Sequence, residues 1–354
     1  MKQPTSTILG VKAKMRKLAS IQRIMALDPI PGADLIEQAK VLGWSCVVLK
    51  GEFNVGDLGV FFEIDSVLPS EASYAQVVEK RKYRIRTQKM KGVISQGLML
   101  PLWKIDDIVF DQFRSTLVED MDVTDILGID LYDPFPETEP GKYVDPLRLF
   151  PWFIPRTSIT RFQSEPALVE EISKIPWVAT EKLDGESMTL WNHEGIYGVA
   201  SRKYTVLEGH RMYELGQELA KGIPDGFAVQ GEFIGPDSRD NPYKLSKNQF
   251  WMFDIFDIKK QMYLSAATLH SGFYSKIGQL TNTRWGINTV PLVAEGEALT
   301  LDQIIKMTPG ESFVVPGKPR EGLVFRPWVE DPRRPLYKRL GAKAIDPMYL
   351  VRHQ

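Results

Sequence analysis

Lys182 is the residue of this chain whose neighbours best fit it to act as a nucleophile. It lies in the run Thr-Glu-Lys-Leu-Asp-Gly-Glu-Ser at 180–187, where a strand-like segment passes into a turn. A lysine attacks only as the neutral amine, which costs about 4.6 kcal/mol at pH 7 for a pKa of about 10.4. The chemistry therefore requires a cation or a desolvated environment beside Lys182. Alone, Lys-x-Asp-Gly is a weak signal, because ordinary residue usage produces it in roughly one chain in ten of this length.

Five further runs supply charged and aromatic groups in a fixed order after Lys182. They are Ser-Arg-Lys at 201–203, Gly-Glu-Phe-Ile-Gly at 231–235, Phe-Trp-Met-Phe-Asp-Ile at 250–255, Glu-Gly-Leu-Val-Phe-Arg at 321–326 and Lys-Ala-Ile at 343–345. Transfer of a nucleotide from a triphosphate depends on positioned charge more than on covalent machinery. A nucleophile, cations and carboxylates are what that reaction needs, so the ordered set strengthens the case for Lys182.

The ordered series resembles the six collinear motifs of the covalent nucleotidyltransferase superfamily, which contains ligases and RNA-capping enzymes. The resemblance covers about residues 155–350. It implies that Lys182 attacks ATP and carries AMP as a lysyl-AMP intermediate. It also implies that Asp184, Glu232 and Glu321 hold a hydrated Mg²⁺ or Mn²⁺, because hard oxygen ligands suit such ions.

The same resemblance implies a set of contacts to the nucleotide. These are Arg202 at the ribose, Phe253 on adenine, Lys343 at the α-phosphate, Arg161 at the leaving phosphates, and Glu181 and Leu183 beside the lysine. The last motif departs from the family pattern, since many relatives have Lys-x-Lys there and this chain has Ala-Lys-Ala at 342–344. Lys338 is a candidate for the missing lysine, and the alternative is that nothing replaces it.

Each of these residues also has an ordinary structural explanation. Strand-end lysines, aromatic residues in strands and isolated glutamates usually serve core packing or solvated surfaces. The order of the motifs, rather than any single residue, favours the functional interpretation. The four histidines lack the spacing of metal ligands and are expected to be structural or surface residues. They are His193, His210, His270 and His353.

The elements that must position these groups are mainly strands. In the second half, strand-like runs cover 177–182, 227–234, 250–258 and 322–328, and apolar residues recur at helical spacing within 207–221. In the first half, short β-type runs such as 44–49 and 60–64 alternate with turn signals, which suggests a small β-barrel. The basic stretch 80–91 contains Tyr83 and is a candidate for phosphate contact, or else a solvated charged face.

A segment with three prolines and a glycine at 134–141 predicts a linker. We therefore expect two domains, 1–135 and 143–354. A β-rich module before the catalytic part resembles the Deinococcus-type and Naegleria-type RNA ligases, with a looser match at 84–98. DNA ligases and capping enzymes append an OB-fold instead, and we expect none after Lys343 because only eleven residues follow it. The implied fold is α+β: an OB-like β-barrel that binds nucleic acid, followed by a nucleotidyltransferase domain of ATP-grasp-like antiparallel sheets with helices.

Composition narrows the class of protein further. The 354 residues include 44 Lys and Arg and 45 Asp and Glu, which gives a formal net charge of -1. Binding to nucleic acid would therefore depend on local basic patches rather than on net charge. Cys46 is the only cysteine, which excludes an intrachain disulfide and a cysteine zinc site. No apolar run approaches the roughly 20 residues that span a bilayer. We expect a monomer in a reducing compartment, cytoplasmic and not secreted, although 11–27 is basic enough for a mitochondrial presequence.

The resulting hypothesis is an ATP-dependent RNA ligase. It would form lysyl-AMP, adenylylate a 5′-phosphate and seal a 3′-OH/5′-phosphate nick, with nicked RNA or an RNA-containing duplex as partner, in RNA repair. One alternative is a GTP-dependent capping-type guanylyltransferase, since the same motifs serve both nucleotides. A second alternative is a catalytically silent RNA-binding protein, against which the intact carboxylates around the lysine argue.

Overall fold

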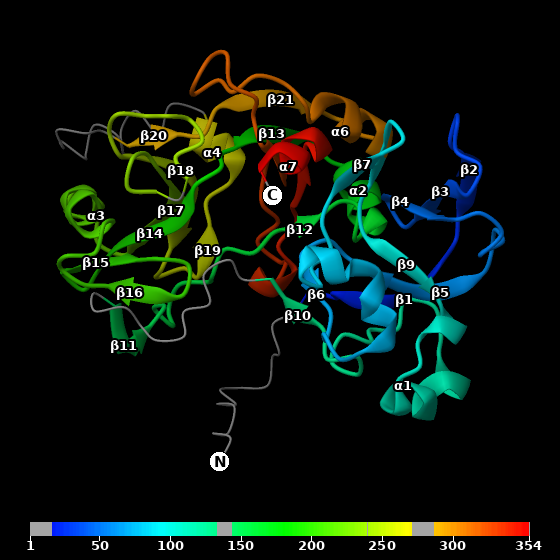
Figure 1. Ribbon diagram of the computed structural model, residues 1–354. Helices are drawn as coiled ribbons and strands as arrows, with labels where there is room; N and C mark the ends of the chain where they lie inside the picture. The colour runs from blue at the N-terminus through cyan, green and yellow to red at the C-terminus, as the bar shows by residue number, and fades with distance from the viewer. Residues whose placement is uncertain (1–15, 133–143, 239, 271–286, 354) are drawn as a thin grey trace.

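A computed structural model describes residues 16–132, 144–238, 240–270 and 287–353, and the predicted linker at 134–141 lies outside them (Figure 1). The part before the linker consists of short antiparallel sheets around one core, with strand orders β1-β5-β9 and β2-β3-β4 in the two larger ones. Its strands are β1 (Ala19–Arg23), β2 (Ala26–Pro29), β3 (Ile36–Val41), β4 (Trp44–Leu49), β5 (Leu58–Phe62), β6 (Ser66–Val67), β7 (Gln88–Met90), β8 (Val93–Ser95), β9 (Leu98–Pro101) and β10 (Asp130–Leu131). Its helices are η1 (Ser73–Arg81), η2 (Leu102–Lys104), α1 (Ile108–Phe113) and η3 (Arg114–Thr116).

Strand β4 illustrates why these residues form half-buried strands. Trp44, Cys46 and Val48 are buried, and the residues between them are partly exposed. This alternation matches the two-residue period of a strand with one face on a core. The expected strand 44–49 agrees with β4, whereas the expected strand 60–64 is displaced from β5 by two residues.

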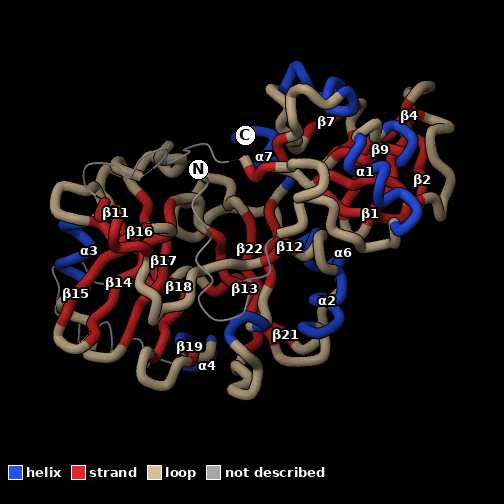
Figure 2. The backbone as a smooth tube through the Cα atoms, turned by 90° about the horizontal axis from the view of Figure 1, so that it is seen from below, coloured by secondary structure: helices blue, strands red, loops and turns tan. Residues whose placement is uncertain are grey.

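The part after the linker is built on two sheets that lie side by side (Figure 2). An eight-stranded sheet has the order β11-β16-β15-β14-β17-β18-β19, with β20 beside β18, and a five-stranded sheet has the order β12-β23-β22-β13-β21. Its strands are β11 (Val144–Leu149), β12 (Thr160–Arg161), β13 (Trp177–Lys182), β14 (Glu186–His193), β15 (Ile196–Ala200), β16 (Tyr204–Val206), β17 (Phe227–Ile234), β18 (Gln249–Asp257), β19 (Met262–Tyr263), β20 (Asn288–Thr289), β21 (Leu292–Gly296), β22 (Gly322–Pro327) and β23 (Ala342–Ile345). Its helices are α2 (Pro166–Ile172), α3 (Tyr213–Ala220), α4 (Ala266–His270), α6 (Leu301–Met307), η4 (Leu336–Lys338) and α7 (Pro347–His353).

The helix expected over 207–221 is shorter than the sequence pattern predicts. It begins at Tyr213 as α3, which packs against β14 and β15 at the outer part of the eight-stranded sheet (Figure 1). Gly209 has a φ of 90°, which a right-handed helix does not tolerate. The residues before Tyr213 therefore form a turn, and the prediction that they are helical was wrong.

The C-terminal helix α7 joins the two parts of the molecule, and Figure 2 shows it at their junction. Leu350 of α7, and Ile345 at the end of β23 just before the helix, are buried in the hydrophobic core of the N-terminal part. Nearby, the Gly43 amide donates a 3.0 Å hydrogen bond to the carbonyl of Gln163. A Cβ at position 43 would lie 2.7 Å from the Cα of Gln163, so the backbones approach too closely for any other residue. The two parts are thus in intimate contact.

Candidate active site

Lys182 is the last residue of β13, and the antiparallel partner of β13 places Gly322 opposite it. The residue before that glycine, Glu321, therefore reaches the lysine, and Nζ of Lys182 lies 2.5 Å from Oε2 of Glu321. Both side chains are largely buried. Gly322 must be glycine, because a Cβ there would lie 2.1 Å from the carbonyl oxygen of Ala344 on β23. Packing of three strands thus fixes the ion pair.

Three carboxylates surround the ammonium group of Lys182. Burial lowers the pKa of Lys182, but the charges of Glu321, Glu232 and Asp184 outweigh burial and raise it above its ordinary value. Burial, together with the charges of Glu321 and Asp184, raises the pKa of Glu232 to about 8. The group holds more acids than cations, so an additional cation would relieve their mutual repulsion and release the lysine proton.

A hydrated divalent ion fits this group better than a directly ligated one. Within the ranges that the structure describes, no set of three His, Cys, Asp or Glu side chains converges closely enough to hold a metal ion. Mg²⁺ commonly keeps several waters and uses few protein ligands. Asp184, Glu232 and Glu321 can hold such an ion through its water molecules. Their role as metal residues stays a prediction.

Two tyrosines hold Asp184 in place. The Asp184 amide donates a 2.8 Å hydrogen bond to the hydroxyl oxygen of Tyr243, and the Tyr349 hydroxyl donates to Oδ2 of Asp184 at 2.6 Å. Gly185 follows, where a Cβ would lie 2.4 Å from the carbonyl oxygen of Phe233. Sequence reasoning missed both tyrosines because they lie outside the six motifs. Only the nearness of Tyr349 to the last motif could have pointed to it.

Lys343 and Arg161 form a second, cationic group beside Lys182. They are register partners in the parallel pairing of β12 with β23. Burial, followed by the charges of Arg161 and Lys182, lowers the pKa of Lys343 to about 7. Burial and the charge of Arg16 lower the pKa of Arg161 to about 10. A bound phosphate would stabilise both cations, as expected for residues that contact a triphosphate.

Glu181 points to the opposite side of β13 from Lys182. Its side chain is 1% exposed, and Oε2 accepts a 2.8 Å hydrogen bond from the amide of Phe313. Its other oxygen, Oε1, is buried and has no hydrogen-bond partner among the residues that the structure describes. Burial is the main cause that raises the pKa of this carboxyl group. A buried acceptor without a partner is costly, so a ligand donor is a reasonable explanation for it.

The remaining predicted residues differ in how close they come to Lys182. Leu183 is buried in an apolar cluster against which Phe253 packs, so these two side chains share one wall. Arg202 is exposed on the turn after β15 and has no hydrogen bond or ion pair with another described residue. Lys338 lies in η4, within the loop that joins the ends of β22 and β23 remote from Glu321. It therefore does not stand in for a lysine beside Lys343.

The basic stretch 80–91 does not form one uniform surface. Lys80, Lys82, Lys89 and Lys91 are exposed. Arg84 instead pairs with Asp65 at 2.7 Å and lies over the ring of Tyr132, 3.6 Å from its centroid. The four exposed lysines can contact phosphates from solvent, whereas Arg84 is occupied by Asp65 and Tyr132 of the same part of the chain.

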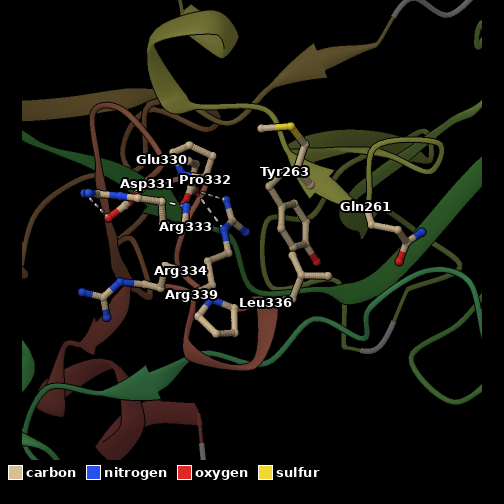
Figure 3. A pocket seen from close by; sticks show the side chains of 11 residues that line it. Gln261, Tyr263, Glu330, Asp331, Pro332, Arg333, Arg334, Leu336 and Arg339 are labelled. Atoms are coloured by element: carbon tan, nitrogen blue, oxygen red, sulfur yellow. Dashed lines mark hydrogen bonds and ion pairs between the residues drawn. The ribbon is translucent and has the colours of Figure 1, made fainter.

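A separate cavity of about 300 Å³ lies beside β19 and η4, and Figure 3 shows its lining side chains. Arg339 lies over the ring of Tyr263 and pairs with Glu330. None of the predicted site residues lines this cavity, and its labelled arginine–carboxylate pairs already satisfy one another. It gives no indication of a ligand.

A strand-end lysine ringed by carboxylates, with a second lysine and an arginine behind it, defines a nucleotidyltransferase active site on two mainly antiparallel sheets. Comparisons with known proteins agree. A family model described as RNA ligase matches residues 175–340, and one described as an OB-fold domain matches residues 18–102. The chain belongs to the RNA ligase family.

Solved structures of Naegleria gruberi RNA ligase resemble the whole chain. A variant with ATP and Mn is 33% identical, with a TM-score of 0.80, over 96% of this chain and 99% of that one. Another variant, with AMP and Mn, is 32% identical, with a TM-score of 0.81 and the same coverage. A structure with PPi is 33% identical, with a TM-score of 0.78, also over 96% and 99%. No curated protein matches the chain. Among the described residues, no helix is long and apolar enough to cross a membrane.

Proposed function

We propose that this ATP-dependent RNA ligase works through Lys182, which becomes covalently attached to AMP. The observation that carries the proposal is the group around the lysine, where Glu321 lies 2.5 Å from Nζ. Naegleria gruberi RNA ligase has been solved with ATP and Mn and with AMP and Mn, which supports the same nucleotide and a divalent metal here. A divalent ion held by Asp184, Glu232 and Glu321 would supply charge that lowers the lysine pKa and neutralises the α-phosphate.

In the first step, the neutral amine of Lys182 attacks the α-phosphorus of ATP. The nitrogen–phosphorus bond forms, the bond from the α-phosphorus to the bridging oxygen breaks, and pyrophosphate leaves with that oxygen. The proton lost by the lysine passes to solvent. Lys343 stabilises the α-phosphate, and Arg161 stabilises the charge that develops on the leaving phosphates.

In the later steps, AMP moves from Lys182 to the RNA and is then displaced. The 5′-phosphate attacks the lysyl-AMP and frees the amine, and the 3′-OH next attacks the activated phosphate, so that AMP leaves and the nick is sealed. A nicked RNA duplex is the proposed substrate, and exposed lysines of 80–91 are its proposed contacts. The proposed division of labour assigns nucleic-acid binding to 1–135 and adenylylation to 143–354.

The unpaired oxygen of Glu181 favours ATP over GTP. The 6-amino group of adenine can donate to this buried acceptor, whereas guanine presents an oxygen at the same position and would repel it. This observation argues against a GTP-dependent capping enzyme. The carboxylates around Lys182 argue against a silent RNA-binding protein, because binding alone needs no such group. All of these side chains come from one chain, so the proposed working unit is a monomer. The single cysteine, Cys46, agrees with a reducing compartment such as the cytoplasm.

Incubation with α-labelled ATP and a divalent metal, followed by denaturing electrophoresis, tests the proposal. The wild-type chain should retain the label, and Lys182→Ala should not, because alanine has no atom that can form the bond to phosphorus. The variant should still seal some pre-adenylylated RNA nicks, since AMP is then already on the substrate. Labelling of Lys182→Ala at the wild-type level would disprove the assignment.

A further inference from the structure

The C-terminal helix α7 directs a hydroxyl group at one of the three carboxylates around Lys182. Tyr349, the third residue of this helix, is 3% exposed, and its hydroxyl donates to Oδ2 of Asp184 at 2.6 Å. A hydrogen bond from a hydroxyl to a charged carboxylate is stronger than one between neutral groups. Oδ1 of Asp184 accepts no hydrogen bond from another described residue, so one oxygen is held in place and the other is left for a ligand.

The phenol ring of Tyr349 has a fixed direction. It stacks on the ring of His353, with ring centroids 4.2 Å apart and an angle of 26° between the planes. The residue just before α7, Asp346, donates a 2.9 Å hydrogen bond from its amide to the carbonyl of Glu321. The helix is therefore tied to Glu321 through the backbone and to Asp184 through the hydroxyl, and both of these acids are predicted metal residues.

Asp184 depends on this hydroxyl because it has no cation of its own. Lys182 pairs with Glu321, and no lysine or arginine in the described part of the chain forms an ion pair with Asp184. Without the hydrogen bond from Tyr349, the carboxylate would be free to rotate toward the ammonium group of Lys182. A direct pair with Lys182 would take Asp184 away from a bound ion and hold the lysine in its inert, charged form.

We propose that Tyr349 is a positioning residue that sets how tightly the active site holds its divalent ion, because it fixes the carboxylate of Asp184. This inference rests on the proposed function and on the metal role that it gives to Asp184. Loss of a hydrogen bond to a metal-holding group commonly lowers metal affinity or activity about 10- to 100-fold. A bound ion would itself orient Asp184, so saturating metal should offset most of the loss. The effect of Tyr349 should therefore be on the metal dependence of the reaction.

Tyr349→Phe in the full chain is the main test, because it removes the hydroxyl and keeps the ring and its stacking on His353. At saturating ATP, the free Mn²⁺ concentration that gives half the maximal rate of lysyl-AMP formation should rise at least about tenfold. The rate at saturating Mn²⁺ should stay within about threefold of wild type. Equal half-saturating concentrations would overturn the proposal, and so would a defect that saturating Mn²⁺ leaves unchanged.

Direct binding of Mn²⁺ gives a readout that does not depend on activity. Electron paramagnetic resonance of free Mn²⁺, with protein and AMP present, measures the dissociation constant, which should rise in Tyr349→Phe. In a double-mutant cycle, Tyr349→Phe should add little to the effect of Asp184→Asn if the hydroxyl acts through that carboxylate. Fully additive effects would contradict the proposal. A wild-type chain that binds no Mn²⁺ would contradict the metal role of Asp184, on which the proposal rests.

Tyr74→Phe is the matched control. Tyr74 is 5% exposed, and its hydroxyl donates to the carbonyl of Leu127 at 3.3 Å in the N-terminal core. This variant also loses one buried hydroxyl, yet its Mn²⁺ dependence should equal that of wild type. An equal shift in Tyr74→Phe would show that any buried tyrosine hydroxyl has the same effect, and the proposal would fail.

A second variant covers the case in which Tyr349→Phe does not fold. His353→Ala keeps the hydroxyl but removes the ring that stacks on Tyr349, so the half-saturating Mn²⁺ concentration should rise at least about twofold. An unchanged value would then overturn the proposal. A wild-type chain that forms no lysyl-AMP would contradict the proposed function itself. A wild-type chain that reacts, but with the same Mn²⁺ dependence as Tyr349→Phe, contradicts only the role of Tyr349.

Discussion

At the scale of single residues, Glu181 illustrates how an unsatisfied group identifies a ligand. Its neighbour Lys182 faces the carboxylates. Glu181 itself is buried, with one oxygen paired to the Phe313 amide and the other without a partner in the described part of the chain. An enzyme that hydrogen-bonds a polar group of its substrate discriminates strongly against an analogue that lacks it. Selection of the base is therefore expected to depend on this one oxygen.

We predict that Glu181→Gln lowers the kcat/KM for lysyl-AMP formation from ATP by about tenfold or more. The ratio of the kcat/KM with ATP to that with GTP should fall as well. The amide can turn an N–H toward the base, which clashes with the amino group of adenine but suits the oxygen of guanine. Labelling with each nucleotide over a range of concentrations measures both values. Glu295→Gln, at an exposed position on the adjacent β21, is the matched control. An unchanged ratio of ATP to GTP would remove Glu181 from base selection.

The sequence motifs predicted which acidic and basic side chains gather around Lys182, but not which neighbouring residues fix their positions. Glu232, Glu321 and Lys343 gather around Lys182 because strand pairing fixes their register, and Asp184 lies in the turn that follows β13. Tyr349 could not be assigned from the sequence, because its contact with Asp184 depends on how α7 packs. The sequence likewise did not indicate that Arg84 is largely buried, because its burial depends on contacts with Asp65 and Tyr132, which are distant in sequence.

At the scale of secondary structure, a buried ion-pair network links the two sheets. Asp254 on β18 is 2% exposed and pairs with Arg326 on β22 at 3.0 Å and with Arg339 at 2.7 Å. Burial acts to raise the pKa of Asp254, but the two guanidinium groups outweigh it and hold the pKa below its usual range. An acid with a lowered pKa stabilises the fold above its unfolded pKa of about 3.9, and this contribution is lost as pH falls through the folded value.

We predict that Asp254→Asn destabilises the protein by about 3–5 kcal/mol at pH 7, because it removes the counter-charge that pairs with buried Arg326 and leaves Arg339 with Glu330 as its only paired carboxylate among the described residues. The difference from wild type should shrink below about pH 4, where the wild-type carboxyl group also becomes protonated. Thermal unfolding at several pH values provides the measurement. Asp331→Asn, in an exposed pair with Arg333, should leave the unfolding temperature unchanged. A constant difference across pH would mean that Asp254 acts through packing alone.

Long strands were easier to predict than helices or short strands. The expected strands 177–182 and 227–234 agree with β13 and β17, because both runs are rich in aromatic and β-branched residues, which favour strands. The two-residue strand β12 carries Arg161, yet it is too short for any sequence pattern to indicate it. Its position depends on parallel pairing with β23, far along the chain.

At the scale of the whole molecule, exposed lysines are the part of the basic stretch 80–91 that can meet RNA. Lys80 and Lys89 are exposed and have ordinary backbone angles, whereas Lys82 and Lys91 have φ values of 52° and 48°. Alanine at the latter two positions would add strain that has nothing to do with RNA. Alanine at Lys80 or Lys89 removes a positive charge without adding backbone strain, so these two positions are suitable for substitution.

We predict that Lys80→Ala combined with Lys89→Ala weakens binding to a nicked RNA duplex and reduces the slope of log affinity against log salt by about one to two. Formation of lysyl-AMP should not change, because neither residue approaches Lys182. Binding measured across salt concentrations gives the slope. Lys174→Ala with Lys306→Ala, two exposed lysines elsewhere, removes equal charge as a control. If both pairs lower the slope equally, the N-terminal basic stretch has no special role.

The position of α7 has a consequence for how the enzyme is made. This helix follows every other part of the site in the sequence, yet it supplies the hydroxyl of Tyr349 that donates to Asp184 and one apolar side chain, Leu350, of the N-terminal core. Ribosomes deliver roughly 5–20 residues each second and domains generally fold as they emerge. The hydrophobic core of the N-terminal part therefore lacks Leu350 until α7 has been synthesised. A nascent chain from which α7 has not yet emerged lacks the hydrogen bond from Tyr349 to Asp184, and we expect it to form no lysyl-AMP.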